Sequence, residues 1–470
     1  MAVFWSRWNK YIIYFMLFSL VVSLVLTGKL SEVQISLLLL PISYYFVQLF
    51  YFQNKQVSSS LFIKKLFIYS FFIRMICVFV LSYILTNYIG IPFLTHKDDY
   101  IYHKTACAIV DRWHTSGIGF YPHLKFSTGS YSGFPNFSAL LMYVFGKSIY
   151  IPRIGNAFFS AWTCIYAYQI CRSYTNENES RLIGILFMAS PLLYIFASLQ
   201  LKDTMLLFLI FGSIKSISDI LSDKISVKST FRLILFILLM VFFRAASIIP
   251  IALSFVLSYA YFAYINKKKR INIARFIVIA FIIVAVIYGW KFLAETKSTR
   301  SAEMYFQSRY LIMSESTIEK SSVGISKLSI AKFIGPPLYI LGGLFLPPAL
   351  LVDLPNQETI NYTFAGLLFH FSVLPFLIIA IFNVVKNRKT MQIPFYILLA
   401  FIFFKIGQAN SLVSILDSRQ SLASIFLMYL LLPAFFMNPS TNGKRNIVIA
   451  ICMVIMIAYS VVRLYSRGLI

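Results

Sequence analysis

The chain has 470 residues, of which 59% are hydrophobic, 17% aromatic and 12% charged. Soluble domains carry about a quarter charged residues, so this composition excludes a water-soluble monomer, and its hydrophobicity excludes a disordered chain. The 42 Lys and Arg residues against 16 Asp and Glu give a formal charge of +26. We assign this excess to loops beside the phosphate headgroups of a lipid bilayer, because no soluble region is present to form a nucleic-acid-binding face.

Apolar runs long enough to cross a bilayer recur along the chain and predict an all-α polytopic integral membrane protein. We expect about 13 transmembrane helices in one transmembrane domain covering 1–470. The runs lie near 11–28, 33–53, 66–89, 152–171, 182–200, 204–222, 231–246, 247–265, 275–293, 362–385, 392–410, 419–437 and 446–463.

The positive residues of the short connections predict the orientation. Lys and Arg gather near the N-terminus and in every second connection, at 55–65, 172–181, 215–232, 267–270, 386–389 and 444–445. Cytoplasmic loops carry such an excess, so the N-terminus is predicted to be cytoplasmic. Two long polar segments, 90–151 and 294–361, then lie outside. An amphipathic stretch near 136–150 is expected in the interface plane, and the proline pairs at 336–337 and 347–348 predict a re-entrant or broken segment.

The densest polar cluster is His96-Lys97-Asp98-Asp99-Tyr100-Ile101-Tyr102-His103, directly after the third run. A carboxylate there could deprotonate an acceptor hydroxyl or hold a divalent cation, or it could simply cap a helix N-terminus. Four of the five histidines share the first long loop, but their spacing matches no metal-ligand motif.

A second set of candidates is cationic and lies where the predicted runs meet the outer face: Arg153, Lys202 (beside Asp203), Arg244 and Arg419. Such residues either snorkel toward headgroups or bind an anionic ligand such as a lipid phosphate. Arg74 lies near the middle of the third run, where a charge is most costly, so it should face the bundle and find a partner there.

Asp98-Asp99-x-x-Tyr102-x-x-x-Ala106 resembles the D-[DE]-x-x-Y-x-x-x-A pattern in the first extracytoplasmic loop of GT-C superfamily glycosyltransferases, especially their family-39-like bacterial branch. Further positions resemble that branch in the same order: Pro135, Gly146, Pro152-Arg153, Asn156, Pro191, Ser198, Leu201-Lys202-Asp203, Phe243-Arg244 and Arg419. The chain departs from the pattern in two extra runs before the Asp pair and in having no separate soluble C-terminal domain, so an oligosaccharyltransferase is not expected.

The resemblance implies transfer of a sugar from a polyprenyl-phosphate-linked donor to a glycan or lipid-linked acceptor, at the outer face of the bacterial inner membrane. It makes Asp98 the general base, and Asp99 its assistant or a cation ligand. Arg153, Lys202, Arg244 and Arg419 become candidates for the donor phosphate, and Tyr102, His103 and Arg74 for contacts with the acceptor or lipid. A divalent cation is left open.

Two other functions stay open at this stage. A repeat-unit polymerase of the O-antigen or capsule type is also basic, polytopic and outward-acting, with two sizeable outer loops. A lipid-linked oligosaccharide flippase is disfavoured by the long outer loops and by the absence of a visible internal repeat.

Overall fold

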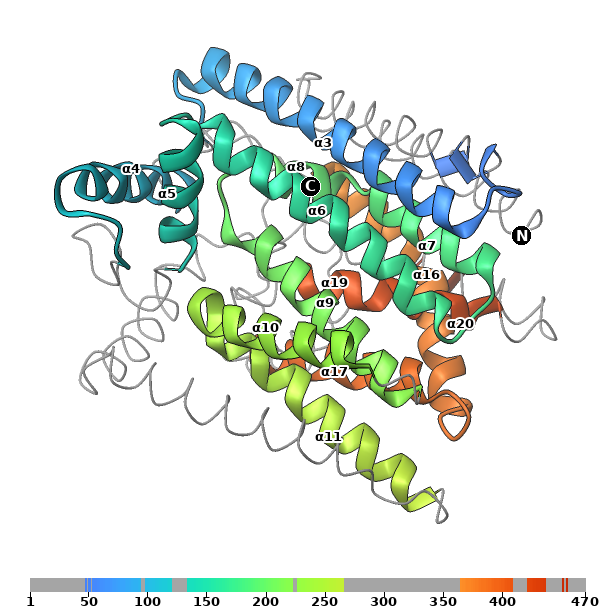
Figure 1. Cartoon of the computed structure of the whole chain (residues 1–470). Helices are drawn as coiled ribbons and strands as arrows, with labels where there is room; N and C mark the ends of the chain where they lie inside the picture. The colour runs from blue at the N-terminus through green and yellow to red at the C-terminus, as the bar shows by residue number, and fades with distance from the viewer. Residues whose placement is uncertain are drawn as a thin grey trace, which may run out of the picture.

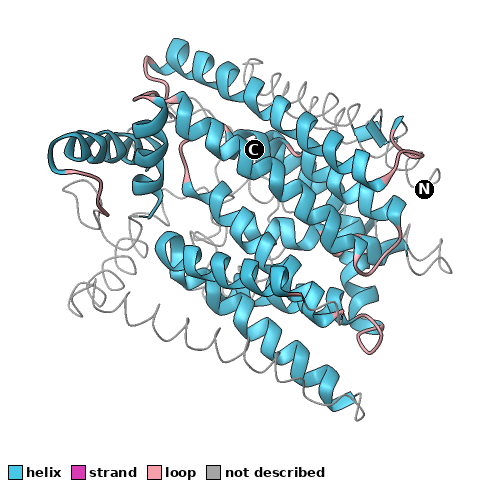
Figure 2. Cartoon of the chain, viewed as in Figure 1, coloured by secondary structure: helices cyan, strands magenta, loops and turns pink. Residues whose placement is uncertain are grey.

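The structure, a computed structural model, describes residues 47–48, 50–51, 53–93, 98–120, 133–222, 226–265, 364–408, 421–436, 450–451 and 454. These residues form helices joined by short loops, with no strand among them (Figure 2). The predicted runs 11–28 and 275–293, most of 33–53 and 446–463, and the second long segment 294–361 lie outside this part of the chain.

The described helices follow the remaining apolar runs closely. They are α3 (Ser59–Ile89), α4 (Asp98–Ser116), α5 (Gly133–Phe145), α6 (Tyr150–Arg172), α7 (Glu177–Ala189), α8 (Pro191–Ala197), α9 (Lys202–Leu221), α10 (Val227–Arg244), η1 (Ala245–Ser247), α11 (Ile248–Ile265), α16 (Phe364–Lys386), α17 (Gln392–Gln408), α19 (Leu422–Tyr429) and α20 (Pro433–Phe436).

Three of the described helices, α3, α9 and α11, are long and apolar enough to cross a membrane, and the bent pair α7–α8 makes a fourth if it counts as one span. A helical membrane protein is therefore supported, whereas the predicted number of about 13 spans is not shown. The helices lie side by side in one bundle, with the α4–α5 pair at one end of it (Figure 1).

Helix α3 shows how sequence spacing divides a membrane helix into two faces. Every fourth residue from Phe62 to Ser82 is buried, whereas large apolar side chains on the other face are exposed, Phe72 by 64% and Tyr83 by 71%. Residues four apart share a helix face, so one stripe packs on the bundle and the other is left for lipid. Gly90, in the left-handed region at φ 79°, ends the helix, and its N–H donates to the carbonyl of Thr86.

Helices α7 and α8 are bent by 50° relative to each other at Ser190-Pro191. A proline has no N–H, so Pro191 cannot donate to the carbonyl of Phe187 four residues earlier. The guanidinium of Arg74 donates to this carbonyl instead, at 3.1 Å, and also to Ser160 Oγ at 2.6 Å. Arg74 is fully buried and faces the bundle as predicted, with neutral partners rather than a carboxylate.

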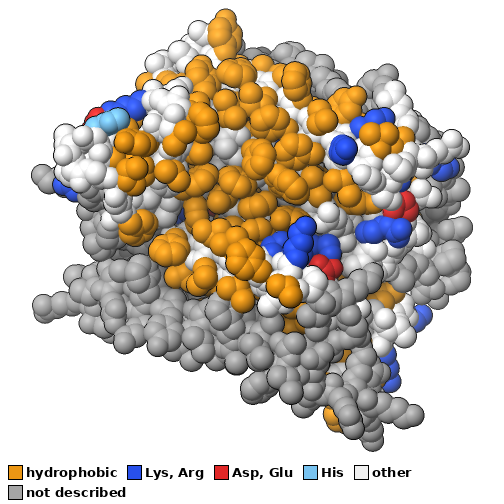
Figure 3. All heavy atoms as spheres, in the orientation of Figure 1, with side chains coloured by type: hydrophobic (Ala, Val, Ile, Leu, Met, Phe, Trp, Pro, Cys, Tyr) orange, Lys and Arg blue, Asp and Glu red, His pale blue; other side chains and the backbone are white. Residues whose placement is uncertain are grey.

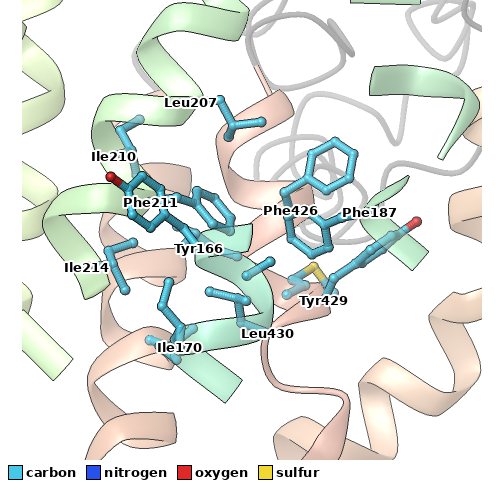
Figure 4. Packing of buried hydrophobic residues seen from close by; sticks show 14 of the residues in the cluster. Tyr166, Ile170, Phe187, Leu207, Ile210, Phe211, Ile214, Phe426, Tyr429 and Leu430 are labelled. Atoms are coloured by element: carbon cyan, nitrogen blue, oxygen red, sulfur yellow. The ribbon is translucent and has the colours of Figure 1, made fainter. Parts of the chain in front are cut away.

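Aromatic side chains fill the centre of the bundle, where α7, α9 and α19 meet (Figure 4). The ring of Phe187 lies 5.3 Å from that of Phe211 and 4.9 Å from that of Phe426, measured between centroids. All three are fully buried. This packing holds the kinked α7–α8 segment firmly against the span that follows it.

The α4–α5 pair carries the first long loop. Helix α4 buries Ala106, Ile109, Val110 and Trp113 against α5, and its other side is exposed. Helix α5 corresponds to the amphipathic stretch expected near 136–150, although it begins at Gly133 and ends at Phe145. Asp111 of α4 and Lys147, just after α5, form an exposed ion pair. Contacts of His103 with Gln200 and of Tyr102 with Lys202 place the start of α4 against the end of the bundle.

Candidate functional site

Four elements meet at one end of the bundle: the end of α3, the start of α4, the start of α6 and the connection between α8 and α9 (Figure 1). Each contributes polar or charged side chains that are buried. We call Asp99, His103, Arg153, Gln200 and Lys202 the end cluster.

Arg153 is the centre of the end cluster. It follows Pro152 in the first turn of α6 and has no exposed surface. Its guanidinium donates to Ser82 Oγ at 2.6 Å and to the carbonyl of Pro92, and it lies 5.4 Å from the centroid of the Phe93 ring. A cation held so firmly away from water contributes a fixed positive charge to this end of the bundle.

The two adjacent aspartates at the start of α4 have different surroundings. Asp99 is buried, with 3% of its surface exposed, and interacts electrostatically with Arg153. Its carboxylate also accepts a hydrogen bond of 3.0 Å from the Tyr100 N–H. Asp98 is exposed. The pair therefore presents one buried carboxylate within the electrostatic influence of Arg153 and a second carboxylate at the surface beside it.

His103 lies one turn further along α4 and contacts the α8–α9 connection. Its Nδ1 is 3.0 Å from Oε1 of Gln200, and its ring is 5.3 Å from that of Phe93. Because an amide oxygen only accepts, this contact sets the tautomer with the proton on Nδ1. Burial lowers the pKa of His103 below its ordinary value of 6.5, and the charge of Arg153 lowers it further, against the effect of the Gln200 hydrogen bond.

Asn156 of α6 holds the connection between α8 and α9 by hydrogen bonds to its backbone. Its Nδ2 donates to the carbonyls of Leu199 and Leu201, at 2.7 and 2.9 Å, so the chain between α8 and α9 is held on both sides of Gln200. The next residue, Lys202, begins α9 and is 93% buried. Its Nζ lies 6.0 Å from the centroid of the Tyr102 ring on α4. Two cations, Arg153 and Lys202, thus lie against the same helix.

Several buried polar atoms around the end cluster have no hydrogen-bond partner among the described residues: Arg153 Nε, Asn156 Oδ1, Gln200 Nε2 and Thr204 Oγ1. Buried donors and acceptors are normally satisfied, so the partners of these four atoms lie in other parts of the chain or in a bound molecule. Two of these groups donate, one accepts and one can do either.

No protein-family model matches the chain, and no curated protein is significantly similar to it in sequence.

The remaining predicted site residues fall outside the end cluster. Arg244 is half-buried at the end of α10, and no hydrogen bond or ion pair joins it to the end cluster within the described residues. Arg74 precedes Ser82 on α3 by two helical turns, about 12 Å along the axis. Its guanidinium is hydrogen-bonded there to Ser160 and Phe187. Arg419 lies outside the described residues. In the described part of the chain, no three His, Cys, Asp or Glu side chains are grouped so that they could hold a metal ion.

Three residues of the site are not identified by the sequence. Ser82 and Gln200 are isolated polar residues in apolar runs, and Phe93 resembles any other aromatic residue near a membrane interface. The one available signal is spacing: Ser82 continues the every-fourth-residue stripe of α3 that also contains Arg74. Nothing in the local sequence distinguishes Gln200, because its role depends on a contact with α4.

Proposed function

We propose that the protein is a membrane glycosyltransferase that transfers a sugar or oligosaccharide from a polyprenyl-phosphate-linked donor to a glycan or lipid-linked acceptor. The observation that supports this proposal is that an exposed carboxylate, Asp98, lies next to the buried Asp99 at the end of the bundle that also holds two buried cations, Arg153 and Lys202. Acid–base chemistry and phosphate stabilisation require these two kinds of group within reach of one substrate.

In the proposed reaction the carboxylate of Asp98 takes the proton of an acceptor hydroxyl. The acceptor oxygen attacks the anomeric carbon of the donor sugar, and the bond between that carbon and the phosphate oxygen breaks. The electron pair leaves with the polyprenyl phosphate, whose growing negative charge Arg153 and Lys202 stabilise. A buried, preorganised cation is effective here because little solvent has to reorganise around the leaving group.

Burial decides which aspartate is assigned as the base. Asp99 is buried and its carboxylate accepts a hydrogen bond from the Tyr100 N–H, so an acceptor hydroxyl has little access to it. Asp98 is at the surface, where an incoming hydroxyl can reach it. We therefore assign Asp99 to positioning Arg153. Both carboxylates are also the residues through which a divalent cation would be held.

The proposed site lies on the outer face of the bacterial inner membrane. Impermeant thiol labelling of whole cells tests this, using Ser116→Cys at the end of α4 and Thr390→Cys in the loop before α17, both exposed. We expect labelling at position 116, above that of the parent chain, and none at 390 before permeabilisation. The reverse pattern would move the proposed chemistry to the cytoplasm.

Glycan analysis of a strain lacking the protein, complemented with variants, tests the activity. Asp98→Asn should abolish the product, because loss of a general base costs about 10²–10⁴-fold in rate. Asp111→Asn is the matched control, since it removes an exposed carboxylate from the same helix. Normal product with Asp98→Asn at normal protein level would refute the assignment of the base.

The same glycan profile separates the two enzymes that the sequence leaves open. Loss of one sugar from an otherwise complete glycan indicates a transferase. Accumulation of a single repeat unit indicates a repeat-unit polymerase, which would use the same donor phosphate chemistry. A chelator that reproduces the Asp98→Asn profile in isolated membranes would show that a divalent cation is required.

A further inference from the structure

The connection between α8 and α9, residues 198–201, is a short stretch of backbone that lies inside the protein. Ser198, Leu199 and Gln200 have no exposed surface, and Leu201 is 3% exposed. Backbone outside regular helices depends on other groups for its hydrogen bonds, and inside a membrane bundle water rarely supplies them. The position of this connection therefore depends on the side chains that donate to it.

Asn156 of α6 donates twice to this connection. It is fully buried and lies one turn after Arg153, on the same side of α6. Its amide nitrogen carries two hydrogens, and both are used, in bonds of 2.7 Å to the carbonyl of Leu199 and 2.9 Å to that of Leu201. A leucine of similar size at this position would donate to neither carbonyl.

These two bonds lie beneath an apolar surface. Hydrophobic side chains cover most of the described face in view in Figure 3, over α3 and α6. Phe158, two residues after Asn156 on α6, is 41% exposed, whereas Asn156 is not exposed at all. Lipid chains on such a face carry no hydrogen-bond donor, so they cannot replace the amide of Asn156.

The two bonded carbonyls lie on either side of Gln200, and Lys202 follows directly. Gln200 Oε1 is 3.0 Å from His103 Nδ1, and Lys202 Nζ is 6.0 Å from the centroid of the Tyr102 ring. Tyr102 and His103 are neighbours in α4, so a movement of the connection would change both contacts together. The flexible four-carbon side chain of lysine has no rigid geometry of its own that would restore its place.

We propose that Asn156 is a positioning residue of the end cluster: through the backbone of the connection, it holds Lys202 where the phosphate of a polyprenyl phosphate is bound. This inference rests on the proposed function, which assigns that phosphate to Arg153 and Lys202. Asn156 acts without touching the donor. It determines how strongly Lys202 contributes, so its loss should weaken binding only while Lys202 is present.

Binding of undecaprenyl phosphate to the detergent-purified full chain, followed by native mass spectrometry, tests this coupling. Asn156→Leu and Lys202→Gln should each weaken binding by about tenfold or more, the effect of a lost charged hydrogen bond. The double variant should bind no more weakly than Lys202→Gln alone, because Asn156 acts through that lysine. Asn156→Ser is a smaller, polar second variant with the same expected effect, since its single hydroxyl hydrogen cannot serve two carbonyls.

Nitrogen NMR of isotope-labelled histidine rings tests the positioning without a ligand. The contact with Gln200 places the neutral His103 proton on Nδ1, so displacement of the connection should move that proton toward Nε2. Both Asn156 variants should show this change, and His103→Gln identifies the resonance. Asn383→Leu is the matched control, because Asn383 Nδ2 donates to the Ala434 carbonyl at 2.9 Å, between α16 and α20. It should change neither the tautomer nor the affinity.

The outcomes separate this inference from the proposed function. The positioning role would be overturned by an unchanged His103 tautomer in both Asn156 variants, by wild-type affinity in them, or by losses that add in the double variant with Lys202→Gln. Asn156 would then be a structural residue, and the proposed function would stand, because the wild type would still bind undecaprenyl phosphate. Failure of the wild type to bind it would instead overturn the proposed phosphate site, and the role of Lys202 with it.

Discussion

Arg153 and Asp99 are opposite charges with 0% and 3% of their surfaces exposed, and their coupling can be measured by a double-mutant cycle. Arg153→Met removes the positive charge that acts on the buried Asp99 carboxylate and the donor to Ser82 and Pro92, which should cost about 3 kcal/mol. Asp99→Asn leaves Arg153 with its bonds to Ser82 and Pro92, so a smaller loss of about 2 kcal/mol is expected. The double variant removes both charges, so its loss should fall short of the sum by about 2 kcal/mol.

The assay is reversible unfolding of the purified chain in mixed micelles, followed by circular dichroism. The exposed pair Asp111–Lys147, with side chains 66% and 40% exposed, provides the matched control. Surface pairs of this kind couple by about 0–1 kcal/mol. If the Arg153 and Asp99 losses add within about 0.5 kcal/mol, the two side chains do not act as a pair, and the reasoning that assigns Asp99 to positioning fails.

Three further predictions concern stability. Arg74→Ala should lower the free energy of unfolding by about 3 kcal/mol, because it leaves buried oxygens without their donor. Since burial lowers the pKa of His103, the unfolded chain binds its proton more readily, so stability should fall as pH drops below about 6.5. His103→Gln should flatten this part of the pH profile. Gly212→Ala should cost about 1–3 kcal/mol by clashing with Phe236, and adding Phe236→Leu should recover part of the loss.

Each of these predictions has an outcome that would contradict it. Lys64→Ala, exposed on the same helix, is the control for Arg74→Ala, and equal effects of the two would mean that the buried arginine contributes nothing. A pH profile that keeps its acid slope in His103→Gln would assign that slope to other groups. A Gly212→Ala chain as stable as the wild type would show that the Phe236 ring moves aside without cost.

The sequence predicts the positions of the described spans because hydrophobicity alone determines where a helix is buried in lipid. It predicts their ends less well. Helix α3 begins at Ser59 rather than at 66, since Lys64 and Lys65 belong to the helix but not to its apolar core. The run 182–200 is predicted as one span, but Pro191 breaks it into α7 and α8.

The candidate site is predictable only where a residue type is costly in a membrane. Arg153 and Lys202 stand out in the sequence as charges at the ends of apolar runs, and the structure brings both against α4. Arg244 has the same sequence signal but is not joined to them. The sequence also cannot predict which of Asp98 and Asp99 is buried. That depends on which side of the first turn of α4 packs toward α6.

The partners of Arg74 impose an order of assembly. Helix α3 must enter the membrane carrying a guanidinium whose acceptors on α6 and α7, at Ser160 and Phe187, are synthesised 86 and 113 residues later. Until those segments arrive, burying this charge in hydrocarbon is costly, so positions near water or the insertion machinery are favoured. The burial of α3 in the finished protein therefore depends on α6 and on the bent α7–α8 pair, both of which are synthesised after it.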